Sequence, residues 1–303
     1  MSTPVRTAGK RGRRPKRPAA DRFPLRFVHD YVSLPAPSYP IDVSGGITAW
    51  GMCANGPDPT CTTYPDGLGD CGFAGRQHNR MAKAACFSET ETWETSNQLA
   101  AEYLAYDHGQ DDGVVVADVL LAWYRAGKIL AFAPVDHANP AAVDSAMQAF
   151  HGVIVGVELT GDADDLFSEG EPWTTANGET PDPDDGHVIV KVKADGQAID
   201  EYVTWGALQP ATLGWSVTCT QEVWAVVTSE DEVTPAELAA MRADIDALGG
   251  HDITGPPTPA PSPSPEPSPD DLLDEFAELV REVAASAEKD VTELLAWLAS
   301  HGR

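Results

Sequence analysis

The order of periodic patterns along the chain is the strongest constraint on its fold. Apolar residues recur at helical spacing in four segments between residues 71 and 150, and strand-like apolar runs follow between residues 153 and 228. Helices first and strands second are typical of an α+β domain, because a parallel α/β sheet would alternate the two along the chain. The sequence therefore predicts a single α+β body.

The elements of this body can be bounded by their flanking residues. Helices are predicted over 71–86, 96–107, 115–126 and 141–150, and strands over 153–159, 187–193, 201–204 and 222–228. A further short helix follows, in which Thr234 is the N-cap, Pro235 the first helical residue and Glu237 the partner in a capping box. Gly249 and Gly250 end this helix.

Composition divides the whole chain into five parts. They are a basic tail (1–22), the body (23–233), the short capped helix (234–250), a Pro-rich linker (251–269) and an amphipathic C-terminal helix (270–303). The tail is predicted to be disordered, since it has almost no apolar residue to bury. The C-terminal helix carries a continuous apolar stripe, which the body, a partner protein or a second copy in a coiled coil could cover.

Charge is distributed unevenly between the tail and the rest. Residues 1–22 contain eight of the 20 basic residues and one acid, so the remaining 12 basic and 46 acidic residues give the rest a net charge of −34. A body this acidic repels nucleic acid and anionic membranes. Nucleic-acid binding through the tail is therefore the weakest functional hypothesis.

Neither a membrane span nor a secretory signal is predicted. The chain lacks an apolar run of about 18 residues, and its basic N-terminus has no apolar segment behind it. We expect a protein that is cytoplasmic as synthesised, or a component of a virion. An odd number of five cysteines without a C-x-x-C pair argues against a disulfide scaffold and a zinc site, so no metal or cofactor is expected. A Cys53–Cys61 bridge across a loop stays open.

The most informative short motif surrounds Cys71. Glycines and aspartates over 66–70 form a tight turn, and a helical pattern begins at the cysteine. A thiol at a helix N-terminus meets the positive end of the helix dipole, which favours the thiolate, and the local backbone N–H groups can bind an oxyanion. The competing interpretation is a buried structural cysteine.

A histidine at a strand start is the second candidate. His187 follows a polar loop and opens an alternating strand, where a base can face a helix N-terminus across a cleft. His78, two helical turns after Cys71, is interpreted as a packed histidine rather than a second catalytic group. A strand ending in Trp205-Gly206 follows His187 at hairpin distance.

Together these motifs resemble the papain-like cysteine peptidases over roughly residues 39–229. The matching elements are Gly69-Asp70-Cys71 at a helix start, a strand opened by His187, and Val203-Thr204-Trp205-Gly206 in place of the family's Asn-Ser-Trp-Gly. The resemblance implies a helical subdomain carrying the cysteine, packed on an antiparallel sheet subdomain carrying the histidine. It also implies that Trp205 shields the catalytic hydrogen bond.

Two positions depart from the family pattern. Val203 stands where the family has the asparagine that orients the histidine, and Pro65 stands where it has the oxyanion glutamine, whose counterpart is displaced to Asn55. Asp70 and Thr204 are expected to support the site. The resemblance implies a thiol hydrolase acting on a peptide or amide, with Cys71 as nucleophile and His187 as general base. The alternative is a non-catalytic papain-fold structural or interaction protein, such as a phage-particle component.

Overall fold

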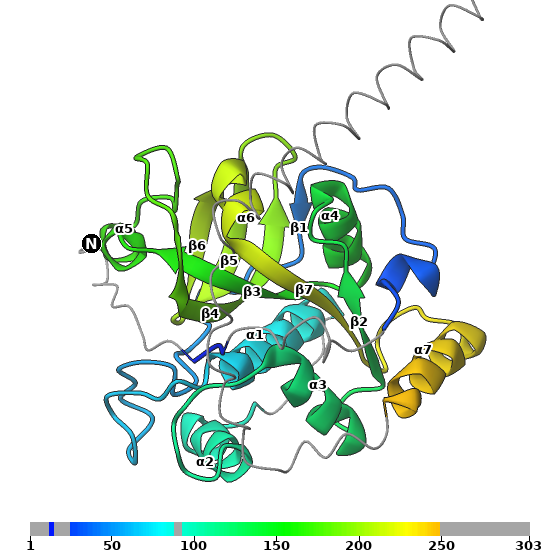
Figure 1. The fold of residues 1–303 in the computed structure, drawn as a ribbon, viewed down its shortest axis with the longest axis horizontal. Helices are drawn as coiled ribbons and strands as arrows, with labels where there is room; N and C mark the ends of the chain where they lie inside the picture. Colours follow the sequence, from blue (N-terminus) through cyan, green and yellow to red (C-terminus); the bar gives the residue numbers. More distant parts are fainter. Residues whose placement is uncertain (1–11, 15–24, 88–92, 249–303) are drawn as a thin grey trace, which may run out of the picture. The chain divides into compact units, whose positions relative to one another are not determined.

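The computed structural model describes residues 12–14, 25–87 and 93–248 (Figure 1). Its helices are α1 (Cys71–Cys86), α2 (Ser96–Tyr106), α3 (Val116–Arg125), α4 (Pro140–Ala149), α5 (Ala163–Glu169), α6 (Leu213–Cys219) and α7 (Pro235–Ala247). Its strands are β1 (Ile41–Asp42), β2 (Ala131–Val135), β3 (Val153–Thr160), β4 (Pro181–Ala194), β5 (Ile199–Thr204), β6 (Ala207–Thr212) and β7 (Thr220–Val227). The Pro-rich linker and the C-terminal helix of the sequence prediction lie outside the described residues.

Within the described residues the strands form one sheet in the order β2-β7-β3-β4-β5-β6, with β1 paired to β4, and every pair is antiparallel. The mixed α+β class predicted from the order of patterns is confirmed. The long strand β4 lies inside the sheet and is buried along most of its length. This position places the segment around His187 at the centre of the molecule.

Helices cover both faces of the sheet (Figure 1). Val188 and Val190 of β4 face Gly75 of α1, whereas Lys191 reaches Asp144 of α4 with an Nζ–Oδ1 distance of 2.6 Å. Because successive side chains of a strand point to opposite faces, α1 and α4 lie on opposite sides of the sheet. Most of α1 is buried, so it is the central helix of its layer.

Aromatic packing holds the other helices around the start of α1. The Phe73 ring lies 5.7 Å from the ring of Tyr103 in α2 and 5.4 Å from that of Trp123 in α3, measured between centroids. Both contacts are edge-on, the geometry that aromatic quadrupoles prefer. Phe73 therefore fixes the helix start that carries Cys71 against two neighbouring helices.

Strands β1, β2 and β6 and the short helices α5 and α6 were not predicted, and β2 and β6 form the two edges of the sheet. Both edge strands contain a proline, Pro134 in β2 and Pro210 in β6, which an edge tolerates because its outer N–H groups need no ladder partner. Asp164 and Asp165 occupy the first turn of α5. Carboxylates there complement the helix dipole.

Other sequence predictions meet the structure directly. Thr234 and Glu237 form the predicted capping box at the start of α7. Cys53 and Cys61 are both free thiols, so the bridge between them is absent. The expectation of a disordered tail does not hold for residues 12–14, because Gly12 and Arg13 are buried in the body. Among the described helices, none has the length and hydropathy needed to cross a bilayer.

Candidate active site

Cys71 is the first residue of α1, as predicted, and its side chain is completely buried. Burial raises the pKa of the thiol to about 12, and the nearby backbone of Val188 and of Gly12 acts in the opposite direction. The thiol therefore lies against the peptide unit that joins His187 to Val188. In this arrangement Cys71 is protonated at neutral pH, and its helix-start position does not offset the loss of solvent.

His187 is also fully buried, and a threonine holds its ring. The distance from His187 Nε2 to Thr204 Oγ1 is 2.8 Å. When Nε2–H donates to the hydroxyl, Nδ1 carries the lone pair that can accept a proton. The sequence comparison placed the orienting residue at Val203, whose side chain has no acceptor. The structure assigns that contact to the next residue, Thr204.

Trp205 stacks on His187 with ring centroids 4.7 Å apart and planes 25° apart. Its backbone has φ 43° and the following Gly206 has φ 77°, so the two residues form a tight turn between β5 and β6. A bulky residue at positive φ is strained. The turn tolerates that strain while it holds the indole over the imidazole, a placement that the Trp-Gly motif predicted.

A second strained turn precedes the helix. Cys53 and Ala54 have φ 52° and 64°, and Asn55 N–H donates to Met52 O at 2.9 Å to close the turn. Gly51 in the same loop forms a β-bridge with Gly206. Two turns that contain non-glycine residues at positive φ therefore meet beside the Cys71–His187 region. Clustered backbone strain of this kind is characteristic of functional sites.

Asn55 and Asp70 support the turn in front of Cys71. Asn55 Nδ2 lies 3.3 Å from Leu68 O. Burial raises the pKa of Asp70 well above its usual range, and neither of its carboxylate oxygens has a hydrogen-bond partner among the described residues. These contacts favour a positioning role for Asn55 over the oxyanion-binding role of the family's glutamine.

The chain's own residues 12–14 fill the space in front of the thiol. Arg13 N–H donates to Gly186 O at 3.2 Å, and Val114 N–H donates to Gly12 O at 2.5 Å. Arg14 N–H donates to Val114 O at 2.7 Å. Residues 12–14 therefore lie as a short strand between the residue before His187 and the start of α3, and nothing in the sequence pattern predicted this placement.

A second cysteine–histidine pair lies nearby. Cys53 Sγ is 3.6 Å from His78 Nε2, which is also 3.0 Å from Gly51 O. Burial lowers the pKa of His78 to about 4 and raises that of Cys53 above its ordinary value. Both groups are therefore neutral at physiological pH. The prediction that His78 is a packed histidine agrees with this environment.

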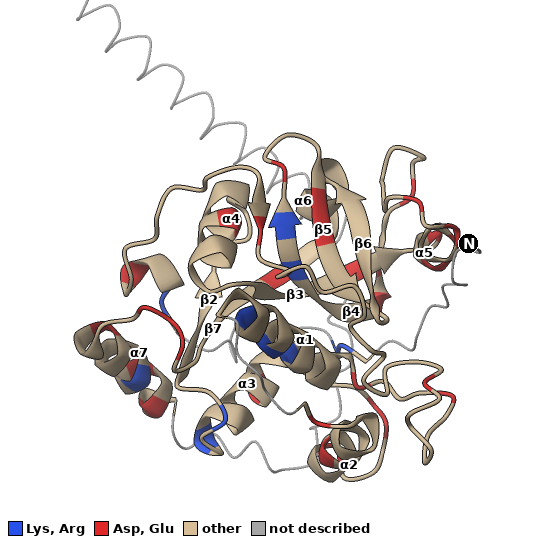
Figure 2. Ribbon diagram, turned by 180° about the vertical axis from the view of Figure 1, so that it is seen from behind, with Lys and Arg blue, Asp and Glu red and all other residues tan. Residues whose placement is uncertain are grey.

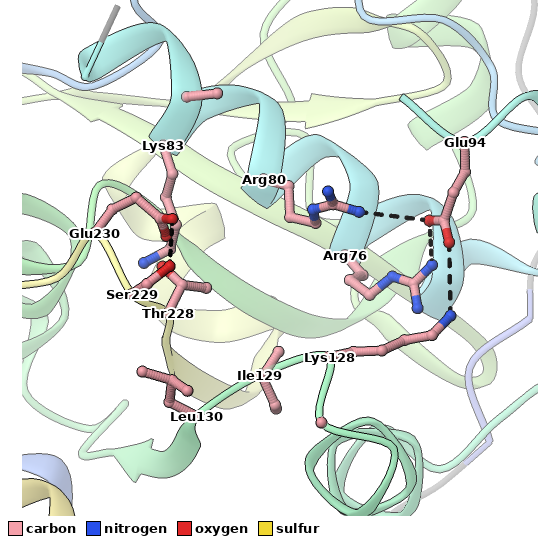
Figure 3. A pocket seen from close by; sticks show the side chains of 12 residues that line it. Arg76, Arg80, Lys83, Glu94, Lys128, Ile129, Leu130, Thr228, Ser229 and Glu230 are labelled. Carbon is pink, nitrogen blue, oxygen red and sulfur yellow. Dashed lines mark hydrogen bonds and ion pairs between the residues drawn. The ribbon is translucent and has the colours of Figure 1, made fainter. Parts of the chain in front are cut away.

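A basic cavity of about 410 Å³ lies toward the other end of α1 (Figure 3). Arg76, Arg80 and Lys128 converge there on Glu94, with Arg80 at 3.7 Å and Lys128 at 3.5 Å. Figure 2 shows Lys and Arg positions in succession along α1. Each named cation already has a carboxylate partner within the chain, so this cavity does not call for an anionic ligand.

Among the described residues, no group of three His, Cys, Asp or Glu side chains is placed to hold a metal ion.

No protein-family model matches the sequence, and no curated protein matches it. Among solved structures, xylellain, a cysteine protease from Xylella fastidiosa, is similar at 9% identity and a TM-score of 0.49. The match covers 75% of this chain and 99% of that one.

Proposed function

We propose that the protein is a papain-like thiol hydrolase that cleaves a peptide or amide bond. The observation that carries the proposal is the contact between Cys71, at the start of the central helix, and the amide that follows His187, whose ring is held by Thr204 and stacked on Trp205. In this proposal Cys71 is the nucleophile, His187 the base and Thr204 the residue that orients the base.

The proposed reaction has two stages, acylation of Cys71 and hydrolysis of the resulting thioester. Cys71 Sγ–H passes its proton to His187 as the sulfur bonds to the substrate carbonyl carbon. Backbone N–H groups at the α1 N-terminus hold the resulting oxyanion. The imidazolium then protonates the leaving amine as the C–N bond breaks, which leaves a thioester on Cys71. Water deprotonated by His187 attacks that thioester, releases the acid and restores the thiol.

Residues 12–14 must leave before this reaction can start. They cover the thiol, and burial keeps the pKa of Cys71 near 12. Once water replaces Gly12 beside the sulfur, the desolvation penalty falls, while the helix start and the Val188 amide still favour the thiolate. The described conformation is therefore a closed state of the proposed enzyme.

The same burial favours one alternative, a non-catalytic interaction protein in which Cys71 is structural and residues 12–14 are a permanent part of the core. This alternative predicts a thiol that stays inert and a chain that hydrolyses nothing.

Mapping of cysteine alkylation by mass spectrometry separates the two functions. Limiting iodoacetamide should label Cys71 ahead of the other cysteines after Arg13→Ala loosens the covering segment, and peptide hydrolysis should be lost on Cys71→Ala. Preferential labelling of Cys53, Cys61, Cys86 or Cys219, or hydrolysis that survives Cys71→Ala, would rule out the proposed nucleophile.

A further inference from the structure

Three glycines, Gly69, Gly113 and Gly186, pack closely against the backbone of residues 12–13. A Cβ atom on Gly113 would come within 2.3 Å of Gly12 O, and one on Gly186 would come within 2.5 Å of Arg13 O. A Cβ atom on Gly12 would itself come within 1.5 Å of Gly69 O. Side chains at these positions would exclude a peptide backbone, so their absence leaves a groove of backbone width directly over Cys71.

Main-chain hydrogen bonds run along this groove. Three bonds add residues 12–14 to the body as an extended segment. Arg13 N–H donates to Gly186 O, Val114 N–H donates to Gly12 O, and Arg14 N–H donates to Val114 O. Strand addition of this kind binds a peptide through its backbone, and specificity then comes from the pockets that receive its side chains.

The Arg13 side chain enters such a pocket. Its Nε lies 2.9 Å from Glu222 Oε1, and both side chains are almost fully buried, at 1% and 6% exposure. Trp224 Nε1–H donates to the other carboxylate oxygen at 2.9 Å and fixes the carboxylate. Gly156 forms the wall, where a Cβ would approach Arg13 Nε to 2.6 Å. The pocket therefore has the shape and charge for a guanidinium group.

The next residue is also recognised. Arg14 Nη2 lies 2.8 Å from Asp107 Oδ1, and Arg14 Nε lies 2.8 Å from Asp112 O. Asp107 Oδ2 accepts the Asp112 amide at 2.7 Å, which holds the carboxylate in place. Two consecutive arginines thus meet two fixed carboxylates, one in the sheet and one after α2. The strongly acidic charge outside residues 1–22 is of the sign that attracts such a ligand.

We infer that the groove over Cys71 selects peptides with a Gly-Arg-Arg-type dibasic segment, that Glu222 determines this selectivity, and that residues 12–14 occupy the groove as an internal competitor. The inference rests on the proposed thiol hydrolase function and names its substrate class. One guanidinium nitrogen of Arg13, Nη1, has no hydrogen-bond partner within the described residues, so the internal segment fits the pocket incompletely. Because this fit is incomplete, a substrate peptide can displace residues 12–14 from the groove.

A peptide copying residues 11–16 (Arg-Gly-Arg-Arg-Pro-Lys) is the probe, with citrulline in place of its first internal arginine as the uncharged isostere. Binding is measured calorimetrically on the full chain carrying Arg13→Ala and Arg14→Ala, which vacates the groove, together with Cys71→Ala, which prevents turnover. We expect the arginine peptide to bind at least about tenfold more tightly than the citrulline peptide. Glu222→Gln should abolish that difference. The Cys71→Ala chain that keeps its arginines should bind the probe more weakly, since its own segment competes at high effective concentration.

A hydrolysis assay tests the arginine groove and the thiol hydrolase function separately. It uses fluorogenic versions of the two peptides and the chain that carries Arg13→Ala and Arg14→Ala but keeps Cys71. Discrimination in binding without cleavage would refute the hydrolase and leave the arginine groove intact. Cleavage of both peptides at equal rates would refute the groove and leave the hydrolase. Equal binding of the two peptides would also refute the groove.

Should the vacated chain fail to fold, hydrogen exchange on Glu222→Gln in the otherwise natural chain tests the same point. Loss of the carboxylate charge should release residues 12–14 and speed exchange at the Arg14 and Val114 amides by about tenfold or more. Unchanged exchange at both amides would overturn the inference.

Discussion

Two buried cysteine–histidine combinations lie in this molecule, and they differ in their contacts and in the backbone around the thiol. Cys53 and His78 are in direct contact, yet the pKa of the histidine falls to about 4 and the pair is locked in a neutral state. Cys71 starts a helix beside His187, with backbone from two other segments near its sulfur and a groove in front of it. Proximity of a thiol and an imidazole is therefore not sufficient for a nucleophile, because the surroundings decide whether charge can develop.

The largest expected effect tests which cysteine reacts. Cys71→Ala should lower kcat/KM by a factor on the order of 10⁴, because the covalent step is lost. Cys53→Ala, the matched control, should leave kcat/KM within about threefold and cost about 1–2 kcal/mol in unfolding free energy, as a small buried group is removed. Both values follow from peptide hydrolysis assays and urea titrations. If the two variants lost activity equally, the distinction between the pairs would be wrong.

The second prediction concerns pH and the His78 pair. The folded-state pKa of about 4 lies below the ordinary value of 6.5, so the neutral form is favoured by folding. The associated stability is fully present above pH 6.5 and is lost as the pH falls through 4, by an amount on the order of 3 kcal/mol.

Urea titrations between pH 7.5 and 4 test this on the natural chain and on His78→Gln, which keeps a donor for Gly51 O but has no titrating ring. The stability difference between the two chains should shrink as the pH falls. A difference that stays constant over this range would show that His78 is not the titrating group.

The two cysteine–histidine combinations also show which parts of the site can be predicted from the sequence. The start of α1 at Cys71 could be predicted, because glycine punctuation and periodicity are local signals. The strand predicted to begin at His187 instead begins at Pro181, so His187 lies inside β4 and does not open it. Thr204 was expected to support the site, but its hydrogen bond with His187 was not predicted, since a strand pattern does not reveal which side chain reaches across to a neighbouring strand. The placement of Gly12 and Arg13 was missed entirely, because these two residues are held by main-chain bonds and by a buried ion pair to Glu222, more than 200 residues away, and not by an apolar pattern.

The third prediction tests the orienting residue, which only the Cys71 site possesses. Thr204→Val keeps the shape of the side chain but removes the hydroxyl that meets His187 Nε2. We expect kcat to fall about 10- to 100-fold with little change in KM, because the ring loses its tautomer and orientation but the groove is untouched. Thr204→Ser should restore most of the activity.

The pH profile of kcat/KM distinguishes an orienting role of Thr204 from a structural one. A residue that only supports packing would leave this profile unchanged. The lower limb of the profile should shift for Thr204→Val and return for Thr204→Ser. An unaltered profile, with activity falling only in proportion to folded protein, would assign Thr204 to packing alone.

The smallest expected effect sets backbone strain against ring stacking at Trp205. Asparagine accepts positive φ far better than tryptophan, so Trp205→Asn should relieve the turn between β5 and β6 by roughly 1 kcal/mol. It also removes the indole that covers His187, which should lower kcat/KM by about tenfold as water reaches the Thr204 hydrogen bond. Trp205→Phe is the control, because it retains both a stacked ring and the strain. A Trp205→Asn chain that is as active as the Trp205→Phe chain would mean that the strained tryptophan serves the fold of the hairpin and not the site.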